Sequence, residues 1–269
     1  MKIEKIGIIG YGKMGRSLAH QFSDQYKIGI YSKGDFETEF EVFDSLESLC
    51  SSSDCLVITI PSEEVKSILD KLSLMEISED KMIFDISTFK KDIIDGYKSL
   101  PEHLTVASAH PMFGEGVDTL KDENVIVVPV ERKEQGLDRV KRFFERFGAD
   151  VSEMSPDKHD ELMKVLIGVP YFFGLSYLSL ISEFEEIERY GGPSFEFLST
   201  YGKAVLNDSP EFIEEVIDRS TDFIEKIFDD PEIEGEELNS LQKKYRKDIE
   251  RSYSKLYELK EKDRSETGG

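Results

Sequence analysis

A turn with three glycines close to the start of the chain constrains the fold more than any other feature. The apolar run at residues 6–9 stops at Gly10, and Gly12 and Gly15 follow at the spacing G-x-G-x-x-G. Beyond the turn, apolar residues recur at the spacing of one buried helix face: Met14, Leu18, Ala19 and Phe22. The order strand, glycine turn, helix therefore predicts the first unit of a dinucleotide-binding sheet.

Each glycine has a separate role in such a turn. Gly10 permits a tight turn, Gly12 lets the backbone approach a pyrophosphate, and Gly15 lets the helix lie close to the strand. The unpaired amides at the helix N-terminus face the phosphates, and the helix dipole favours their charge. We expect the following residues to bind the nucleotide: Gly10, Tyr11, Gly12, Lys13, Met14 and Gly15. The alternative is a glycine turn that arose by chance.

The end of the second predicted strand, 26–31, indicates which dinucleotide binds. An Asp or Glu at this strand end binds the ribose 2′-hydroxyl of NAD and repels the 2′-phosphate of NADP. Here the strand is followed by Ser32 and Lys33, a small hydroxyl and a cation, which favours NADP over NAD. The alternative is that Lys33 is a solvated loop residue and that Asp35 binds NAD.

Strand patterns alternate with helical patterns as far as residue 154. Further strands are predicted at 55–60, 82–86, 105–109, 124–129 and 151–154, and helices at 45–49, after a Ser62 cap, and at 134–147. Pro61 ends the strand 55–60 and is assigned to the nucleotide site. This alternation predicts a Rossmann fold, a doubly wound parallel sheet covered on both faces that binds ligands at the carboxyl ends of its strands.

The pattern changes at Ser155, after which no strand-like run follows. Ser155 is expected to cap a long helix that ends at Ile181, followed by helices at 195–206 and 209–228. The uncharged stretch 165–182 is at the lower length limit for a membrane span, but its glycines and proline favour a buried core helix. The predicted domains are a Rossmann domain at 1–154, an all-helical domain at 155–264 and a disordered tail at 265–269.

Composition narrows the range of partners. The 269 residues include 34 basic and 56 acidic ones, and the net charge of −22 argues against binding to nucleic acid or to an anionic membrane. Cys50 and Cys55 form neither a disulfide framework nor a metal-ligand pattern. A strand at the very start leaves no room for a signal peptide. We expect a cytoplasmic protein that binds a small-molecule substrate.

Polar residues after the strand 82–86 are the first candidates for chemistry. Thr88 and Lys90 follow this strand closely, and a hydroxyl and an amine there would face the crevice where a nicotinamide binds. The alternative, compatible with the first, is that Ser87 or Thr88 caps a helix.

His110 is the sharpest candidate, because it directly follows the predicted strand 105–109. Pro111 restricts the backbone of His110 to an extended form, and Gly114 permits the turn that follows. An imidazole can accept a hydroxyl proton near neutral pH, as the oxidation of an alcohol by hydride loss requires. The alternative is a structural histidine. We expect no chemistry from His20 or His103.

His159 lies in the first turn of the long predicted helix, where the helix dipole disfavours a cation. This mismatch suggests a use, such as a contact across the cleft between the two domains. The alternative is a solvated residue of the first turn.

Four motifs together resemble the prephenate dehydrogenase family, which includes arogenate dehydrogenases. Residues 10–15 resemble its nucleotide loop, and residues 85–90 resemble its D-x-x-S-x-K stretch, with Thr88 in the place of the serine. His110 opens an H-P-M-F-G motif, and His159 opens the H-D start of the second domain. The resemblance implies a Rossmann domain joined to an all-helical domain through which two chains form a homodimer. It also implies oxidation of prephenate to 4-hydroxyphenylpyruvate with NAD or NADP, on the route to tyrosine.

The resemblance also implies roles for individual residues. His110 would accept the proton of the ring 4-hydroxyl as hydride leaves the same carbon, and loss of carbon dioxide would make the ring aromatic without a metal. Thr88 would hydrogen-bond the same hydroxyl and orient it. Lys90, His159 and Lys203 are assigned to the substrate.

The second half departs from the family pattern. Residues 168–171 read Gly-Val-Pro-Tyr where many members have H-L-P-H, and Glu196 stands where members often carry an arginine for a substrate carboxylate. The candidate cations are Lys203, Lys164, Arg189 and Arg219. Arogenate has an ammonium that would suit Glu196, so an arogenate dehydrogenase, or one for another cyclic hydroxy acid, is one alternative. A non-catalytic redox sensor that binds NADP is another.

Overall fold

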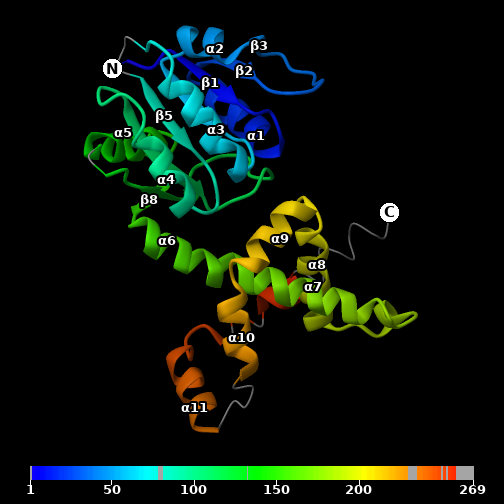
Figure 1. Ribbon diagram of the computed structural model, residues 1–269. Helices are drawn as coiled ribbons and strands as arrows, with labels where there is room; N and C mark the ends of the chain where they lie inside the picture. Colours follow the sequence, from blue (N-terminus) through cyan, green and yellow to red (C-terminus); the bar gives the residue numbers. More distant parts are fainter. Residues whose placement is uncertain are drawn as a thin grey trace. The chain divides into compact units, whose positions relative to one another are not determined.

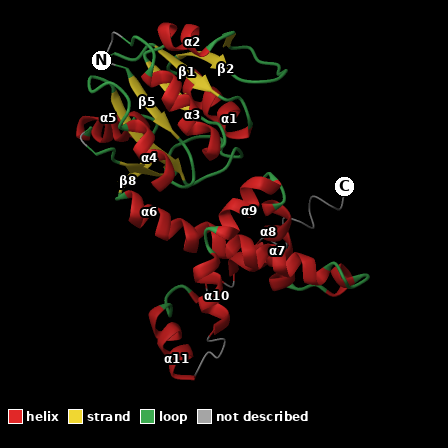
Figure 2. Cartoon of the chain, in the orientation of Figure 1, coloured by secondary structure: helices red, strands yellow, loops and turns green. Residues whose placement is uncertain are grey.

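The computed structural model describes residues 2–77, 81–131, 133–229, 235–249, 251–252 and 254–258. The chain divides into two compact units, Met1–Glu161 and Leu162–Gly269. Among the described residues, the strands lie in the first unit (Figure 2). The division falls within the long helix and not at the predicted position ahead of Ser155, so His159 belongs to the sheet unit. The predicted tail at 265–269 lies outside the described residues.

The first unit is built on one eight-stranded sheet with the order β3-β2-β1-β4-β5-β6-β7-β8. Its strands are β1 (Lys5–Ile9), β2 (Lys27–Tyr31), β3 (Glu41–Val42), β4 (Cys55–Ile58), β5 (Met82–Asp85), β6 (Thr105–Pro111), β7 (Asn124–Val128) and β8 (Asp150–Glu153). Neighbouring strands are parallel except β6 and β7. The prediction of a doubly wound α/β sheet is therefore confirmed.

Two details of the sheet differ from the prediction. β7 runs antiparallel to β6, because the connection between them, residues 112–123, has no helix to carry the chain back across the sheet. β3 was not predicted, since two residues are too few to produce a strand pattern in the sequence.

Helices cover both faces of this sheet (Figure 1). The helices α1 (Lys13–Ser23) and α5 (Glu134–Glu145) pack on one face, where Phe22 and Phe143 join the core with Ile6 and Ile8 of β1. The helices of the other face are α2 (Leu46–Ser52), α3 (Ser62–Ser73) and α4 (Lys91–Tyr97). α4 was not predicted, and the cap of α3 is Pro61, not Ser62 as predicted. Side chains that alternate along each strand thus reach opposite layers.

The second unit consists of helices in its described residues. They are the end of α6 (Pro156–Met163), a π-helical turn at Lys164–Gly168, α7 (Val169–Ile181), a 3₁₀ turn at Ile187–Tyr190, α8 (Pro193–Val205), α9 (Pro210–Asp218), α10 (Thr221–Asp229) and α11 (Gly235–Lys244). The long helix is present but contains the π turn just before Pro170. A proline has no N–H to donate and crowds the carbonyl four residues earlier, so the backbone widens there. The helix predicted at 209–228 is broken between α9 and α10.

The apolar surface of α7 contradicts the prediction of a buried core helix. Only 17% of the most apolar window of Pro156–Ile181 is buried. The exposed apolar side chains on this stretch are Val165, Leu166, Phe173 and Leu180. Among the described residues, this is the one helix long and apolar enough to cross a membrane by length and composition, which alone is weak evidence.

Candidate active site

The glycine turn between β1 and α1 has the geometry that a pyrophosphate requires. Gly10 has φ +97°, and a Cβ on Gly15 would lie 2.3 Å from the carbonyl oxygen of Gly10, so neither position accepts a side chain. A Cβ on Gly12, by contrast, would meet none of the described atoms within 4 Å. Gly12 is also the N-cap of α1 and has no side chain to occupy the first amides. The turn therefore leaves open backbone amides for an anionic group, and the residues present fit a dinucleotide.

A cavity of about 250 Å³ extends from this turn towards α3. It brings together residues that are far apart in the sequence: Gly10, Gly12, Ser32, Lys33 and Pro61. Ser32 helps to shape it, because its Oγ accepts a hydrogen bond of 3.0 Å from the backbone N–H of Tyr11. The cavity lies where β1 separates β2 from β4, the point at which the strand order reverses.

Three residues assigned to the nucleotide have side chains engaged elsewhere. The ring of Tyr11 is buried against Phe36 at 5.2 Å, and its Oη accepts a hydrogen bond from Thr38 Oγ1. The backbone of Tyr11 therefore lines the cavity while its side chain belongs to the core. Lys13 Nζ lies 3.8 Å from a carboxylate oxygen of Glu115, and Met14 is half-buried in α1.

Glu64 is a residue of this cavity that sequence reasoning missed. It lies in the first turn of α3, lines the cavity and forms an ion pair with Lys33, through Nζ and Oε2. The hydrogen bond that Lys33 donates to Glu64 raises the pKa of Lys33. Lys33 is thus one half of a cation–carboxylate pair that lines the cavity. The signal was an acidic residue in the first turn of the helix that follows β4.

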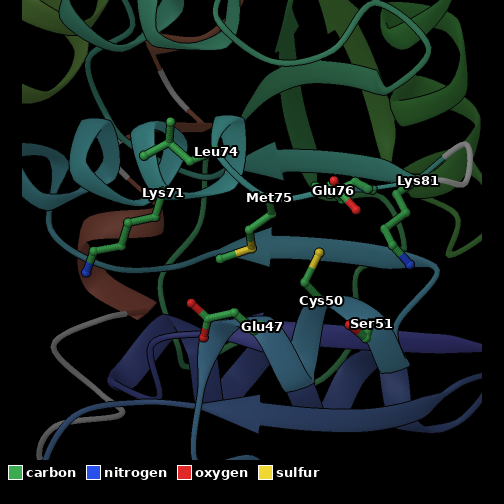
Figure 3. Close-up of a pocket in the computed structure, with 9 residues that line it drawn as sticks. Glu47, Cys50, Ser51, Lys71, Leu74, Met75, Glu76 and Lys81 are labelled. Carbon is green, nitrogen blue, oxygen red and sulfur yellow. The ribbon is translucent and has the colours of Figure 1, made fainter.

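A larger cavity, of about 610 Å³, lies at the opposite edge of the sheet (Figure 3). Cys50 of α2, Met75 after the end of α3 and Lys81 ahead of β5 line it. These positions surround the amino ends of the strands, whereas ligands of such sheets bind at the carboxyl ends. The Lys81 ammonium already donates to the carbonyl of Ser53, and burial raises the pKa of the Cys50 thiol. We therefore place the chemistry at the carboxyl ends of the strands, where the smaller cavity lies.

His110 lies inside β6, not just beyond it, because the strand continues to Pro111. Its side chain is buried, and its Nδ1 lies 3.0 Å from Nε2 of His159. His159 Nδ1 in turn lies 2.9 Å from Oδ1 of Asp160. His159 therefore contacts His110 within the sheet unit, whereas the sequence suggested a contact across the cleft between the two domains.

Lys90 occupies a buried polar cluster and not an open crevice. Its side chain is 0% exposed, and its Nζ donates to the carbonyl of Ala109 at 2.5 Å and lies 3.4 Å from Asp85 Oδ2. Asp85 also accepts hydrogen bonds from Tyr97 Oη and from the backbone N–H of Ser87, both 2.8 Å long. The prediction that Lys90 faces substrate is corrected, because its ammonium is enclosed by protein.

Thr88 lies three residues before the start of α4 but does not cap it. It is half-buried between β5 and α4, and the N-cap of α4 is Lys90, so the predicted cap by Ser87 or Thr88 is wrong. The hydroxyls of Ser87 and Ser108 are buried without a hydrogen-bond partner among the described residues.

The electrostatics of this cluster keep both imidazoles neutral. Burial, the charge of Lys90 and the neighbouring His159 lower the pKa of His110 well below its ordinary value of 6.5. Burial also lowers the pKa of His159, although the hydrogen bond to Asp160 opposes the shift. Both rings are therefore uncharged near pH 7, the state in which a histidine can accept a proton.

The four candidate cations for the substrate carboxylate lie in the second unit, and three of them, Lys164, Lys203 and Arg219, contact acidic side chains there. Lys203 Nζ of α8 lies 3.4 Å from Glu188 Oε1. Lys164 Nζ lies 3.0 Å from Asp222 Oδ2. The assignment of Lys203 to the substrate stays a prediction.

Comparison with known proteins tests the family resemblance. A sequence model described as prephenate dehydrogenase, nucleotide-binding domain, matches residues 23–153. The probable arogenate/prephenate dehydrogenase of Methanocaldococcus jannaschii is 23% identical over 167 residues, which cover 58% of this chain and 36% of that protein. The cyclohexadienyl dehydrogenase of Zymomonas mobilis is 23% identical over 216 residues, which cover 71% of this chain and 73% of that protein. The match thus spans about a third of the first relative's length.

A solved structure supports the fold independently. Prephenate dehydrogenase from A. aeolicus, in complex with hydroxyphenyl propionate and NAD+, superposes with a TM-score of 0.68 at 20% identity. The superposition covers 99% of this chain and 98% of that one. At this identity the likeness establishes the fold.

The sheet, the open glycine turn and these matches define a nucleotide-binding protein whose curated relatives are dehydrogenases. More narrowly, residues 23–153 match the nucleotide-binding domain of prephenate dehydrogenases, and this match and the curated relatives support the prephenate/arogenate dehydrogenase family for this chain. The resemblance seen in the sequence is therefore confirmed. The match begins within α1, so the glycine turn at residues 10–15 is an additional observation.

Proposed function

We propose that this protein is an NAD(P)-dependent prephenate dehydrogenase, which converts prephenate to 4-hydroxyphenylpyruvate and carbon dioxide in tyrosine biosynthesis. The observation that carries the proposal is a buried, neutral His110 in the same sheet unit as an open dinucleotide turn. A neutral imidazole can accept the hydroxyl proton that alcohol oxidation releases. A redox sensor would need the turn but would have no use for such a base.

In this proposal each group has one task. The glycine turn, Ser32 and Pro61 hold the dinucleotide, whose nicotinamide ring supplies a hydride acceptor when it is bound. His110 accepts the proton of the ring 4-hydroxyl, and Thr88 orients that hydroxyl. The carboxyl group on the ring leaves as carbon dioxide, and its bonding electrons complete the aromatic ring. No residue has to hold a metal for these steps.

Kinetics with prephenate and arogenate test the choice of substrate. We expect prephenate to give the higher kcat/KM. Glu196 on α8 is the observation that favours arogenate, because its carboxylate suits the ammonium that replaces the keto group. A higher kcat/KM for arogenate would assign the protein to the alternative substrate, and turnover of neither would refute the dehydrogenase proposal.

The Lys33–Glu64 pair predicts how the cofactor preference responds to mutation. We propose NADP as the preferred cofactor, with Lys33 reading the 2′-phosphate and Glu64 moderating that preference. Lys33→Asp should lower the ratio of kcat/KM for NADP to that for NAD by roughly tenfold, equivalent to about 1.4 kcal/mol. Glu64→Gln should raise the same ratio, because it removes a negative charge beside the phosphate. If neither variant changes the ratio, the ribose is read elsewhere, for example by Asp35.

We also propose that the protein works in the cytoplasm as a homodimer paired through its second unit. The exposed apolar side chains of Val165, Leu166, Phe173 and Leu180 support this, because contiguous apolar surface of this kind marks interaction sites. Sedimentation analysis without detergent should give twice the mass of one chain. A monomer under these conditions would contradict the proposal.

A further inference from the structure

Asp160 anchors a line of hydrogen bonds that ends at His110. Its Oδ1 accepts from the backbone N–H of Lys90 at 2.8 Å, and its Oδ2 accepts from the backbone N–H of Lys91 at 2.9 Å. Burial alone would raise the pKa of Asp160, but the hydrogen bonds from His159 and from these two amides together lower it. Asp160 is therefore a carboxylate, which can only accept hydrogen bonds.

The position of each proton in this line of hydrogen bonds follows from the Asp160 carboxylate. Because Asp160 accepts, Nδ1 of His159 must donate to it across 2.9 Å. A neutral imidazole carries one N–H, so Nε2 of His159 is an acceptor. Nδ1 of His110, 3.0 Å away, must then be the donor, and the proton of His110 resides on Nδ1. Nε2 of His110 is then the unprotonated nitrogen and keeps its lone pair.

The opposite assignment requires a charged His159. A doubly protonated His159 would donate from Nε2, so Nδ1 of His110 would be the acceptor. The proton of His110 would then reside on Nε2, and this nitrogen could not accept a proton from a substrate. The charged groups that face this pair are Lys90, Asp85 and Asp160. Burial and the Lys90 ammonium outweigh the two carboxylates, so the pKa of His159 is lowered and its neutral form is favoured.

We propose that His159 and Asp160 are positioning residues, which hold His110 in the tautomer with Nδ1 protonated and Nε2 free to act as the base. The tautomer follows from the contacts together with the neutral state of His159, and its catalytic use rests on the proposed dehydrogenase function. In the reaction, the substrate O–H bond breaks and its proton forms a bond to Nε2 of His110. The resulting imidazolium is stabilised through its Nδ1–H bond to His159. The Asp–His pair of serine proteases performs a comparable orienting task.

A purely structural role for Asp160 has to be separated from this one. Asp160 binds the first amides of α4, so an Asp160 variant would alter that helix as well as the tautomer. His159→Phe is the sharper probe, because it keeps a ring of similar shape and leaves Asp160 in place. His159→Gln is the matched rescue variant, since its amide oxygen can accept a hydrogen bond near the position of Nε2.

The decisive experiment is ¹⁵N NMR of histidine-labelled protein at pH 8 without substrate. The chain has four histidines. The variants His20→Gln and His103→Gln identify the signals of these two residues and leave those of His110 and His159. Both variants should have unchanged activity. We expect His110 and His159 both to show a protonated Nδ1 and an unprotonated Nε2. Free histidine prefers the other tautomer, so this pattern requires a cause in the fold. A protonated Nε2 on His110 would overturn the inference, whether or not the protein turns over prephenate.

Kinetics of the His159 variants test whether His159 positions His110 for catalysis. His159→Phe should lower kcat by roughly 10- to 100-fold, since the ring loses its orienting partner, while KM for the cofactor stays unchanged. His159→Gln should recover part of the loss. Unchanged kcat in a folded His159→Phe variant would overturn the positioning role, and if that variant does not fold, the wild-type spectrum still decides the tautomer. A correct tautomer with no turnover of any cyclohexadienol would refute the proposed function and leave the inference standing.

Discussion

Replacing His110 with asparagine should lower kcat by about 10²- to 10⁴-fold, the range that general bases contribute. An amide cannot take up a proton near neutral pH, so the hydroxyl proton of the substrate would have no acceptor. Asparagine can still hydrogen-bond to His159, which keeps the local fold. Cofactor affinity should be unchanged, because residues of β1, the glycine turn, β2 and α3 line the nucleotide cavity and His110 does not.

Steady-state kinetics and direct nucleotide titration measure the two quantities separately. His20→Asn is the matched control, because His20 is exposed on α1 beside Glu39. Turnover that survives in His110→Asn would show that another group is the base. Loss of nucleotide binding would show that His110 belongs to the cofactor site.

The pH profile of the wild-type protein carries a related expectation. His110 must be unprotonated to act, and burial, Lys90 and His159 lower its pKa well below 6.5. The acid limb of kcat/KM should therefore lie below pH 6.5, since this limb reports the pKa of the essential base in the free enzyme. An acid limb at or above pH 6.5 would contradict the electrostatic account.

Lys90→Met should reduce the free energy of unfolding by about 3–5 kcal/mol, the cost of leaving one member of a buried ion pair without its partner. Lys90 and Asp85 are both 0% exposed, so water cannot replace the missing ammonium beside the Asp85 carboxylate. The Ala109 carbonyl would lose its hydrogen bond as well. Because the chain has no tryptophan, urea unfolding followed by circular dichroism is the suitable measurement.

The neighbouring lysine provides the control for this prediction. Lys91 is exposed and pairs with Asp157 at 2.9 Å, so Lys91→Met should change the stability far less than Lys90→Met. Adding Asp85→Asn to Lys90→Met should recover part of the loss, because it removes the unpaired charge. Equal stability of the Lys90 and Lys91 variants would contradict a structural role for the buried pair.

Local patterns predicted most of the sheet unit. Runs such as 6–9 and 55–60 identify strands because residues of a central parallel strand are buried on both faces. The glycine turn was predictable because its three positions follow from backbone geometry. The antiparallel β7 was not, since strand direction depends on how the chain crosses the sheet between residues 112 and 123.

The candidate site was predictable in its residues but not in its contacts. His110 and His159 both stood out, yet the hydrogen bond between them joins positions 49 residues apart, and no local pattern encodes such a contact. Lys90 was predicted to face the nicotinamide crevice. Its burial could not be predicted, because it depends on Asp85 and Ala109, which reach Lys90 only in the folded sheet. The apolar residues of α7 predicted a buried helix, but most of the helix is not buried within the single chain. Burial depends on what packs against the helix, and the local sequence does not encode that.

The central claim is that His110 serves as the base for an oxidation by a bound nicotinamide. Its most direct test is an assay of the purified protein with prephenate and either NADP or NAD, in which reduced cofactor, 4-hydroxyphenylpyruvate and carbon dioxide are all quantified. The account predicts equal amounts of the three products with the wild-type protein, and almost none with His110→Asn. Stoichiometric cofactor binding without any product from the wild-type protein would contradict it.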